Sequence, residues 1–281
     1  MPLGTLYIVA TPIGNLEDIT LRALRILKEV GLIAAEDTRH SRKLLSHYGI
    51  SRPLTSYFDH NKEFKGNYLL EKLTEGVSVA LISDAGTPCI SDPGYQLVRD
   101  AVAAGITVVP IPGPSAAITA IAASGLPTDR FAFEGFLPNR QGKRRERLAS
   151  LRDERSVLIF YESPNRLVAT LEDMAEILGD REAVVARELT KLYEEFVRGS
   201  LTFLAERFRE RKVRGEVVVI VAPAAEQQER EGFSVSSLLQ NLLTSGDISL
   251  KDAVKRVALE TGAPRGEVYD EALRVKAGLK K

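Results

Sequence analysis

Apolar runs alternate with amphipathic stretches along most of the chain. Residues 4–11, 77–83 and 215–223 are apolar runs that predict strands, and the run at 77–83 leaves no room for a solvent-facing side. Residues 20–30 place three leucines and an isoleucine at helical spacing. Strands that alternate with helices predict an α/β fold with a mostly parallel sheet, covered by helices on both faces.

The alternation occurs twice before the chain becomes wholly helical. The first block predicts an N-terminal α/β domain over residues 1–122, and the second predicts a C-terminal α/β domain over 123–225. In the second block, strands at 131–135 and 156–162 flank a charged stretch. The sequence therefore predicts two α/β domains.

Polar residues 224–233 are typical of a linker, and residues 226–281 predict a small helical domain. The apolar positions of one helix in this region define a narrow stripe: Leu250, Ala253, Val254, Val257 and Ala258. This region has helix–glycine–helix spacing similar to a helix-turn-helix motif. Two roles remain open for it: presenting Lys251, Lys255, Arg256 and Arg265 to RNA, or packing as a bundle on the main body.

Composition limits the classes of protein to which the chain belongs. Lys plus Arg equals Asp plus Glu at 38 each, so any basic surface for nucleic acid has to be local. The single Cys89 excludes an internal disulfide framework and a multi-cysteine zinc site, and it fits a reducing compartment. The first residues do not resemble a signal peptide, and no apolar stretch is long enough to span a membrane. We expect a cytoplasmic protein.

Four loops rich in Gly, Pro, Asp and Ser follow predicted strands, at residues 10–20, 35–42, 83–94 and 110–117. In parallel α/β sheets, ligands gather outside the carboxyl ends of the strands. Each loop taken alone is explained by ordinary turn and capping chemistry. Four such loops at one sheet edge favour a shared binding site.

Several ligand classes are excluded by missing motifs. The chain has no G-x-G-x-x-G fingerprint after its first strand, no phosphate-binding P-loop and no G-x-S-x-G elbow. Its three histidines and one cysteine do not have metal-ligand spacing, so we expect no metal site. The residues alone therefore predict a small-molecule site in a two-lobed α/β protein.

Seven ordered motifs between residues 9 and 191 carry a family resemblance. They are "VATPIGNLEDIT", "AEDTRHSRKLL", "LISDAGTPCISDPG", "VVPIPGPSAA", "FEGFLP", "FYESPNR" and "ARELTK". They resemble the tetrapyrrole-methylase-fold (class III) S-adenosylmethionine-dependent methyltransferases. Within this family they match the branch that methylates the ribose 2′-hydroxyl of a cytidine in the decoding region of 16S ribosomal RNA. The resemblance implies two α/β domains with the cofactor in the cleft between them, and a homodimer.

The resemblance also assigns the S-adenosylmethionine site to particular positions of this sequence. These are Ile13, Ser83, Asp84, Thr87, Ser115, Ala116, Tyr161, Glu162 and Leu189. The tetrapyrrole enzymes carry Gly-Asp-Pro where this chain has Ser83-Asp84-Ala85, which argues against a porphyrin-precursor substrate. Asp92 has two readings of similar weight, as part of the site or, with Ser91, as a cap of the following helix.

Methyl transfer to a ribose hydroxyl requires positioning and the removal of one proton. The candidate catalytic residues are Asp37, Arg39, Glu188 and Lys191, and Glu36 and His60 are further candidates for the base. Asp37 is equally well explained as a helix N-cap, and Glu188 with Lys191 as a surface ion pair. The sequence does not select a single base.

Binding to 16S rRNA, expected within the small ribosomal subunit, requires local positive charge. The charged stretch at 139–155 supplies it in the residues Arg140, Lys143, Arg144, Arg145 and Arg147. A charge run is often only a solvated helix face, but an RNA substrate favours a phosphate-binding arm. Two alternatives to an rRNA methyltransferase remain: a small-molecule, tetrapyrrole-like methylase of the same fold, and a non-catalytic RNA-binding assembly factor.

Overall fold

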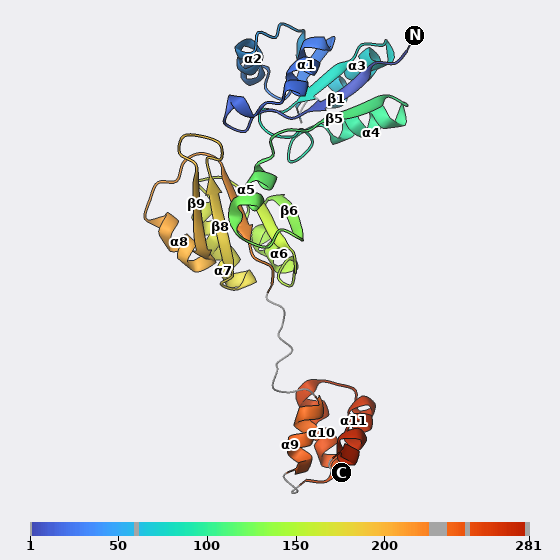
Figure 1. Cartoon of the computed structure of the whole chain (residues 1–281), viewed down its shortest axis with the longest axis vertical. Helices are drawn as coiled ribbons and strands as arrows, with labels where there is room; N and C mark the ends of the chain where they lie inside the picture. Colours follow the sequence, from blue (N-terminus) through green and yellow to red (C-terminus); the bar gives the residue numbers. More distant parts are fainter. Residues whose placement is uncertain (1, 59–61, 225–234, 245–247, 279–281) are drawn as a thin grey trace. The chain divides into compact units, whose positions relative to one another are not determined.

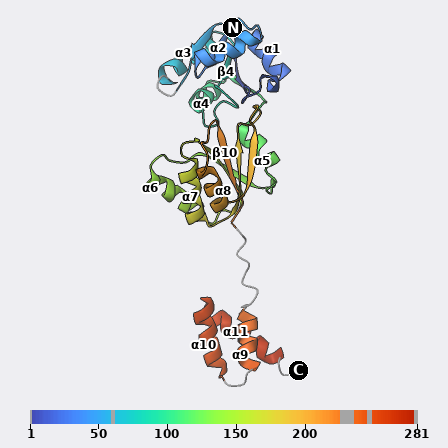
Figure 2. The ribbon, with the colours of Figure 1, turned by 90° about the vertical axis from the view of Figure 1, so that its left-hand side faces the viewer.

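The computed structural model describes residues 2–58, 62–224, 235–244 and 248–278. The chain divides into two compact units, Met1–Ala224 and Ala225–Lys281 (Figure 1). The first unit contains two sheets, each with its own helices, and the second is helical (Figure 2). Among the described residues, no helix is long and apolar enough to cross a bilayer.

The first sheet is entirely parallel, in the order β3-β2-β4-β1-β5. Its strands are β1 (Thr5–Val9), β2 (Leu32–Ala35), β3 (Leu54–Ser56), β4 (Val79–Ile82) and β5 (Thr107–Ile111). Its helices are α1 (Leu21–Glu29), α2 (Thr38–His47), α3 (Lys62–Thr74) and α4 (Tyr95–Ala103). We call this sheet with its four helices the first lobe.

Side chains on the two faces of this sheet enter two different cores. One core joins α1 and α2 to residues such as Ile33 and Ile82, and the other joins α3 and α4 to Ala34 and Leu81. Because successive residues of a strand point to opposite faces, a strand buried on both sides is apolar throughout. The parallel sheet covered on both faces that the sequence predicts is therefore confirmed.

The second sheet is mixed, in the order β6-β7-β10-β8-β9. Its strands are β6 (Phe131–Phe136), β7 (Val157–Glu162), β8 (Glu182–Arg187), β9 (Glu195–Ser200) and β10 (Val217–Val221). Only β6 and β7 pair in parallel, and the other pairs are antiparallel. Its helices are α5 (Ala116–Ser124), α6 (Gln141–Ser150), α7 (Leu167–Leu178) and α8 (Leu201–Arg209).

We call the second sheet with α5–α8 the second lobe. Helix α5 follows the first sheet in the chain but packs on one face of the second sheet, while α6, α7 and α8 cover the other face. The boundary expected at residue 122 thus falls inside α5. Arg198 of β9 fastens this helix, since its guanidinium donates to the carbonyls of Ala123 and Ser124 at the helix end.

The second unit consists, in its described residues, of α9 (Val235–Thr244), α10 (Leu250–Thr261) and α11 (Arg265–Gly278). These helices share an apolar core of their own, and the predicted stripe of α10 contributes to it through Ala253, Val254 and Val257. Apart from Ala224, the linker expected at 224–233 lies outside the described residues.

Candidate functional site

A cavity of about 460 Å³ lies in the first unit, and loops of both lobes line it. The first lobe contributes Ile13, Glu36, Asp84, Ala85, Gly86, Thr87, Ile90, Ser91 and Asp92. The N-terminus of α5 and the second sheet contribute Ser115, Ala116, Phe136, Tyr161, Glu162, Ser163, Pro164, Leu189, Gly215, Glu216, Val217 and Val218. The volume is that of a site for a small organic ligand.

The loop that follows β4 is hydrogen-bonded to the three other loops at this sheet edge. Thr11 and Gly86 exchange backbone hydrogen bonds of 2.9 and 3.0 Å. The hydroxyl of Thr87 donates to the carbonyl oxygen of Pro114 at 3.2 Å, and the backbone N–H of Asp37 donates to Oδ1 of Asp84 at 3.1 Å. The structure therefore brings the four loops together, as the sequence predicts.

The same loop carries backbone strain. The non-glycine residues Cys89 and Ser91 have φ values of 73° and 65°, whereas Gly86 adopts its φ of 79° without a steric penalty. Such conformations persist where surrounding structure enforces them, and they concentrate at binding sites. The N-cap of α4 is Gly94, without a side-chain cap, so Asp92 does not cap that helix. Asp92 instead lines the cavity.

The cavity is anionic with apolar walls. Five carboxylates line it, from Glu36, Asp84, Asp92, Glu162 and Glu216, and within the described ranges no Lys or Arg lines it. Burial raises the pKa of Asp92; a hydrogen bond from Ser83 opposes this shift and the charge of Asp84 adds to it. Such a site favours a ligand that combines positive charge with a flat apolar group.

Leu189 lines the cavity, and the backbone on either side of it is held in the left-handed conformation. The residues on either side, Glu188 and Thr190, have φ values of 52° and 65°. Glu188 is fixed to the start of β10, since its backbone N–H donates to the carbonyl of Glu216 at 3.0 Å and its carboxylate accepts the Glu216 N–H at 3.1 Å. Leu189 is thereby held almost fully buried against the cavity.

Lys191 binds two carboxylates at the edge of this wall. Its Nζ lies 2.8 Å from Oε1 of Glu188 and 2.9 Å from Oε2 of Glu216. Partial burial disfavours the charged amine, but the two hydrogen bonds outweigh it and raise the pKa of Lys191; the same contact lowers the pKa of Glu188. Glu188 and Lys191 therefore form an ion pair that supports the wall, and neither lines the cavity.

The two lobes approach closely at Lys191. A Cβ added to Gly14 would lie 2.5 Å from Cγ of Lys191, so the turn after β1 accepts only glycine at this point without rearrangement. Gly14 and Lys191 follow Ile13 and Leu189 closely in the chain, and both of those residues line the cavity.

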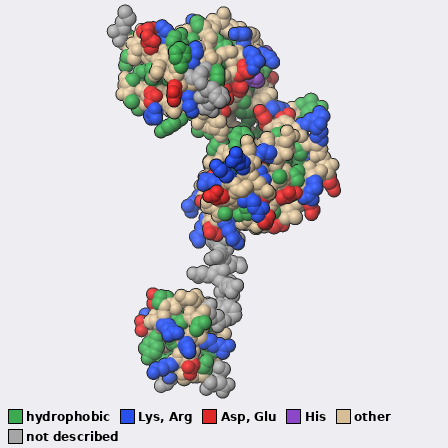
Figure 3. Space-filling view, turned by 180° about the vertical axis from the view of Figure 1, so that it is seen from behind, with side chains coloured by type: hydrophobic (Ala, Val, Ile, Leu, Met, Phe, Trp, Pro, Cys, Tyr) green, Lys and Arg blue, Asp and Glu red, His purple; other side chains and the backbone are tan. Residues whose placement is uncertain are grey.

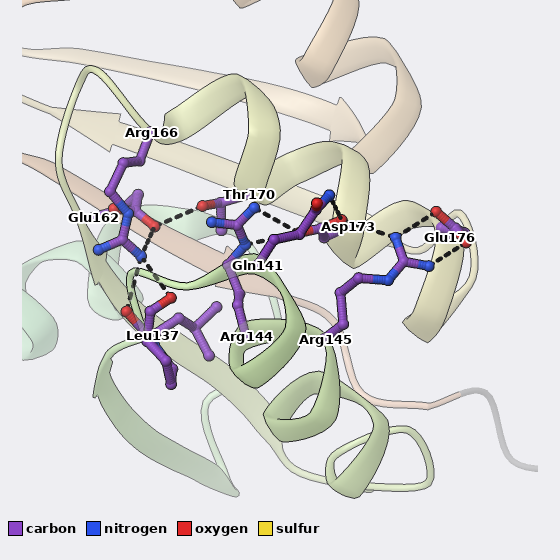
Figure 4. Close-up of polar contacts among 10 residues, drawn as sticks. Leu137, Gln141, Arg144, Arg145, Glu162, Arg166, Thr170, Asp173 and Glu176 are labelled. Carbon is purple, nitrogen blue, oxygen red and sulfur yellow. Dashed lines mark hydrogen bonds and ion pairs between the residues drawn. The ribbon is translucent and has the colours of Figure 1, made fainter.

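Glu162 is a buried carboxylate with every contact supplied by its own lobe (Figure 4). Its oxygens accept hydrogen bonds from the Thr170 hydroxyl and the Ser163 N–H, both at 2.7 Å, and pair with Arg166 at 3.3 Å. A buried charge is tolerated when it is paired and hydrogen-bonded in this way.

The residues that the family resemblance assigned to the cofactor lie together. Ile13, Asp84, Thr87, Ser115, Ala116, Tyr161, Glu162 and Leu189 all line the cavity. Ser83 does not line the cavity and is buried, with 3% of its surface exposed. Phe136, Gly215 and Glu216 line the cavity as well, although they are not among the predicted site residues. The motif "FEGFLP" contains the first of them, and the predicted strand at 215–223 begins at the other two.

Asp37 and Arg39 have a structural role in this arrangement. The Asp37 carboxylate caps α2 by accepting the Arg39 N–H at 2.8 Å, and it pairs with the Arg39 guanidinium at 2.9 Å. These contacts lower the pKa of Asp37 to about 2, which makes it a poor proton acceptor. Neither residue lines the cavity. The alternative reading of Asp37 as an N-cap is the one that the structure supports.

The expected phosphate-binding arm is the helix α6, and two of its arginines are not available to a phosphate. Arg144 is 5% exposed, and its Nε and second guanidinium nitrogen lie 2.7 and 2.6 Å from Asp173 of α7 (Figure 4). Arg145 pairs with Asp173 and Glu176. This part of the expectation is corrected: Arg144 and Arg145 join α6 to α7. Arg144 is a buried guanidinium, which requires a carboxylate, and the partly exposed Arg145 shares Asp173 and also pairs with Glu176.

Three cations of the arm remain exposed: Arg140, Lys143 and Arg147, of which Arg147 pairs with Glu134. On the face seen in Figure 3, Lys and Arg side chains are mixed with Asp and Glu rather than forming one continuous basic surface. In the helical unit, Lys251, Lys255, Arg256 and Arg265 are exposed. His60 lies outside the described residues.

Comparisons with known proteins agree with this architecture. The family model for tetrapyrrole (corrin/porphyrin) methylases matches residues 5–205. The chain is 50% identical to the ribosomal RNA small subunit methyltransferase I of Halalkalibacterium halodurans, over 95% of this chain and 94% of that protein. It is 48% identical to the protein of the same name from Pseudomonas aeruginosa, over 98% of each.

A solved structure supports the fold independently of close sequence similarity. The uroporphyrin-III C-methyltransferase of Thermus thermophilus in complex with S-adenosylhomocysteine superposes with a TM-score of 0.54 at 22% identity, over 78% of this chain and 97% of that one. The chain therefore belongs to the tetrapyrrole (corrin/porphyrin) methylase family, and within it to the group that contains the ribosomal RNA small subunit methyltransferases I.

Proposed function

We propose that this protein transfers a methyl group from S-adenosylmethionine to the ribose 2′-hydroxyl of a cytidine in the decoding region of 16S rRNA. The observation that supports the proposal is the cavity, which has apolar walls and is lined by five carboxylates and by no Lys or Arg of the described residues. This cavity lies in a chain that is about half identical to rRNA methyltransferases. S-adenosylmethionine supplies an electrophilic methyl group on a sulfonium, together with an ammonium group and an apolar adenine.

The residues of the cavity fit this cofactor. Carboxylates at Asp84 and Asp92 favour the two positive charges, and the backbone turn at Gly86 allows close approach of the ligand. Leu189, Val217 and Val218 offer the apolar surface that an adenine ring requires. Glu162, held by Thr170 and Arg166, adds a fixed negative charge on the side of the second lobe.

The ribose hydroxyl must lose its proton when its oxygen attacks the methyl group. Asp92 is the carboxylate that we assign to this step, since it lines the cavity and its raised pKa makes it a better proton acceptor than Asp37. Glu188 and Lys191 have a positioning role, because they hold Leu189 and the start of β10 against the cavity.

The RNA backbone is bound by exposed cations. These are Arg140 and Lys143 at the start of α6 and, in the helical unit, Lys251, Lys255, Arg256 and Arg265. The substrate is the 16S rRNA within the small ribosomal subunit, and the protein acts as a homodimer in the bacterial cytoplasm, where that RNA resides. The tetrapyrrole-like alternative is disfavoured by Ser83-Asp84-Ala85 and by the curated relatives, which are named for ribosomal RNA.

The test is a transfer assay with radiolabelled S-adenosylmethionine and three acceptors: small subunits lacking the modification, naked 16S rRNA, and a tetrapyrrole precursor. We expect label in 16S rRNA of the subunits, at a nucleotide whose ribose has become resistant to alkaline cleavage. Label in the precursor alone would support the small-molecule methylase. RNA binding without transfer would support the assembly factor.

A further inference from the structure

Strand β6 contains a bulge that changes the direction of one aromatic side chain. The pairing of β6 with β7 shifts between Phe133 and Gly135, and Gly135 has a φ of 64°. Phe133 pairs with Ile159 and Phe136 with Tyr161, so four residues of β6 lie opposite three of β7. In a regular strand, residues three apart point to opposite faces, and the bulge brings these two to the same face.

Both phenylalanines contact the same ring as a result. The ring centroids of Phe133 and Phe136 lie 4.9 and 5.6 Å from that of Tyr161, both in edge-to-face geometry. Phe133 is half-buried behind the wall, whereas Phe136 lines the cavity and is 57% exposed. Bulges are common beside active sites, where they direct a side chain toward a ligand.

The chain is also fixed on the other side of Phe136. The guanidinium of Arg166 donates to the carbonyl of Leu137 at 2.8 Å (Figure 4). It also contacts the carbonyl of Pro138 at 3.4 Å and the side chain of Asn139. The same guanidinium pairs with Glu162 in the cavity wall. The backbone on both sides of Phe136 is therefore fixed, by the bulge and by Arg166, while more than half of this large apolar side chain faces solvent.

A second exposed apolar side chain lines the cavity from the first lobe. Ile90, in the strained loop of the first lobe, lines the cavity and is 47% exposed. The cavity is otherwise anionic, so Phe136 and Ile90 leave apolar surface in contact with solvent at its edge. A flat apolar group of a ligand would bury this surface, which is favourable.

We propose that Phe136 is the platform on which the base of the target nucleotide stacks, and that Ile90 adds apolar surface from the first lobe. This inference rests on the proposed rRNA substrate and names the subsite for its base. Every base has a flat face that stacks on an aromatic ring, and an enzyme that modifies one nucleotide takes it out of its stack.

The distribution of charge favours this orientation of the RNA. Carboxylates line the cavity and repel phosphates, so the RNA backbone remains outside while one base and its ribose enter. Helix α6, with exposed Arg140 and Lys143, begins five residues after Phe136 and offers positive charge for the flanking phosphates. The adenine of the cofactor is a second planar group that would cover the Phe136 ring, and the experiment distinguishes it from the base of the RNA.

The test compares Phe136→Ala, Phe136→Leu and Phe136→Tyr with the wild type. Phe64→Ala is the matched control, because Phe64 on α3 is 77% exposed and does not line the cavity. Two quantities are measured: the dissociation constant of S-adenosylmethionine by calorimetry, and the concentration of small subunits that gives half-maximal transfer at saturating cofactor.

Phe136→Ala and Phe136→Leu are expected to raise the half-saturating subunit concentration by about tenfold or more, with cofactor affinity unchanged. Phe136→Tyr and Phe64→Ala are expected to remain near the wild type. Weakened cofactor binding in Phe136→Ala, or wild-type behaviour of Phe136→Leu, would overturn the assignment. A wild type that binds cofactor but methylates no subunits would contradict the proposed function itself, and the subsite with it.

Discussion

The backbone N–H of Asp37 donates a hydrogen bond to Oδ1 of Asp84, 3.1 Å away, and joins the carboxyl ends of the neighbouring strands β2 and β4. Asp84 thus has two functions in our account: it connects two loops of the first lobe, and it places a negative charge in the cavity. Substitutions can separate these functions, because asparagine keeps an acceptor oxygen and loses the charge.

Asp84→Asn and Asp84→Ala are both expected to weaken binding of S-adenosylmethionine by about tenfold or more, since a charged hydrogen-bond acceptor is lost. Calorimetric titration measures this effect. Asp100→Ala on α4 is the matched control, because Asp100 does not line the cavity and its carboxylate pairs with the neighbouring Arg99. An unchanged dissociation constant for Asp84→Asn would remove its charge from the proposed binding site.

Asp173→Ala is expected to destabilise the protein by about 3–5 kcal/mol, because the buried Arg144 loses its carboxylate. Urea unfolding measures the change. The control is Glu29→Ala, which breaks the exposed pair of Arg25 and Glu29 and is expected to cost at most about 1 kcal/mol. Equal effects of the two substitutions would show that the Arg144 pair is not buried as described.

Arg140→Ala combined with Lys143→Ala is expected to weaken binding to 16S rRNA. The slope of the logarithm of the binding constant against the logarithm of the salt concentration is expected to become shallower by about two. Cofactor affinity is expected to stay constant. Arg22→Ala with Lys28→Ala on α1 removes the same charge from exposed positions of the first lobe and serves as the control. A salt slope equal to that of the control would exclude α6 from the RNA contact.

Gly215→Ala is expected to lower the melting temperature and weaken cofactor binding. A Cβ at this position would lie 2.1 Å from Oε1 of Glu188, and the φ of 85° disfavours any side chain. Adding Glu188→Ala relieves the steric overlap and is expected to recover part of the loss. Gly142→Ala is the control, since no atom lies within 4 Å of its Cβ position. Wild-type stability of Gly215→Ala would contradict the contact.

The Asp37 cap predicts a pH dependence of stability. The pKa of Asp37 is lowered from 3.8 to about 2, so the ionised carboxylate stabilises the folded state above pH 3.8, and this stabilisation is lost as the pH falls toward about 2. Asp37→Asn retains a capping oxygen without the charge. We expect the melting temperatures of wild type and Asp37→Asn to differ near neutral pH and to converge in acid. A difference independent of pH would contradict the assignment.

The apolar runs allowed most strands and helices to be predicted, because burial on both faces of a parallel sheet requires uninterrupted apolar sequence. Strand β9 was not predicted, since the edge strand "EFVRGS" is half-exposed and contains two charged residues. Helix α6 was expected only as a charged stretch. Its buried face consists of Leu148 and the aliphatic and ionic parts of Arg144, so it lacks the apolar stripe that indicates a helix.

The four loops of the site could be predicted from turn residues after strands, but the roles of single side chains could not. Whether Asp37 caps a helix or faces a ligand depends on where Arg39 lies, and whether Arg144 faces solvent depends on Asp173, 29 residues away. Phe136 was missed because a bulge, which has no clear signal in a single sequence, decides the direction of its side chain.

The most direct test of the account is the structure of this protein in complex with S-adenosylmethionine. The account predicts the methyl donor in the cavity between the lobes, with its charged groups beside Asp84 and its adenine against Leu189 and Val217, and with the methyl group accessible from the side of Phe136. A donor bound outside this cavity, or a titration without binding, would contradict it.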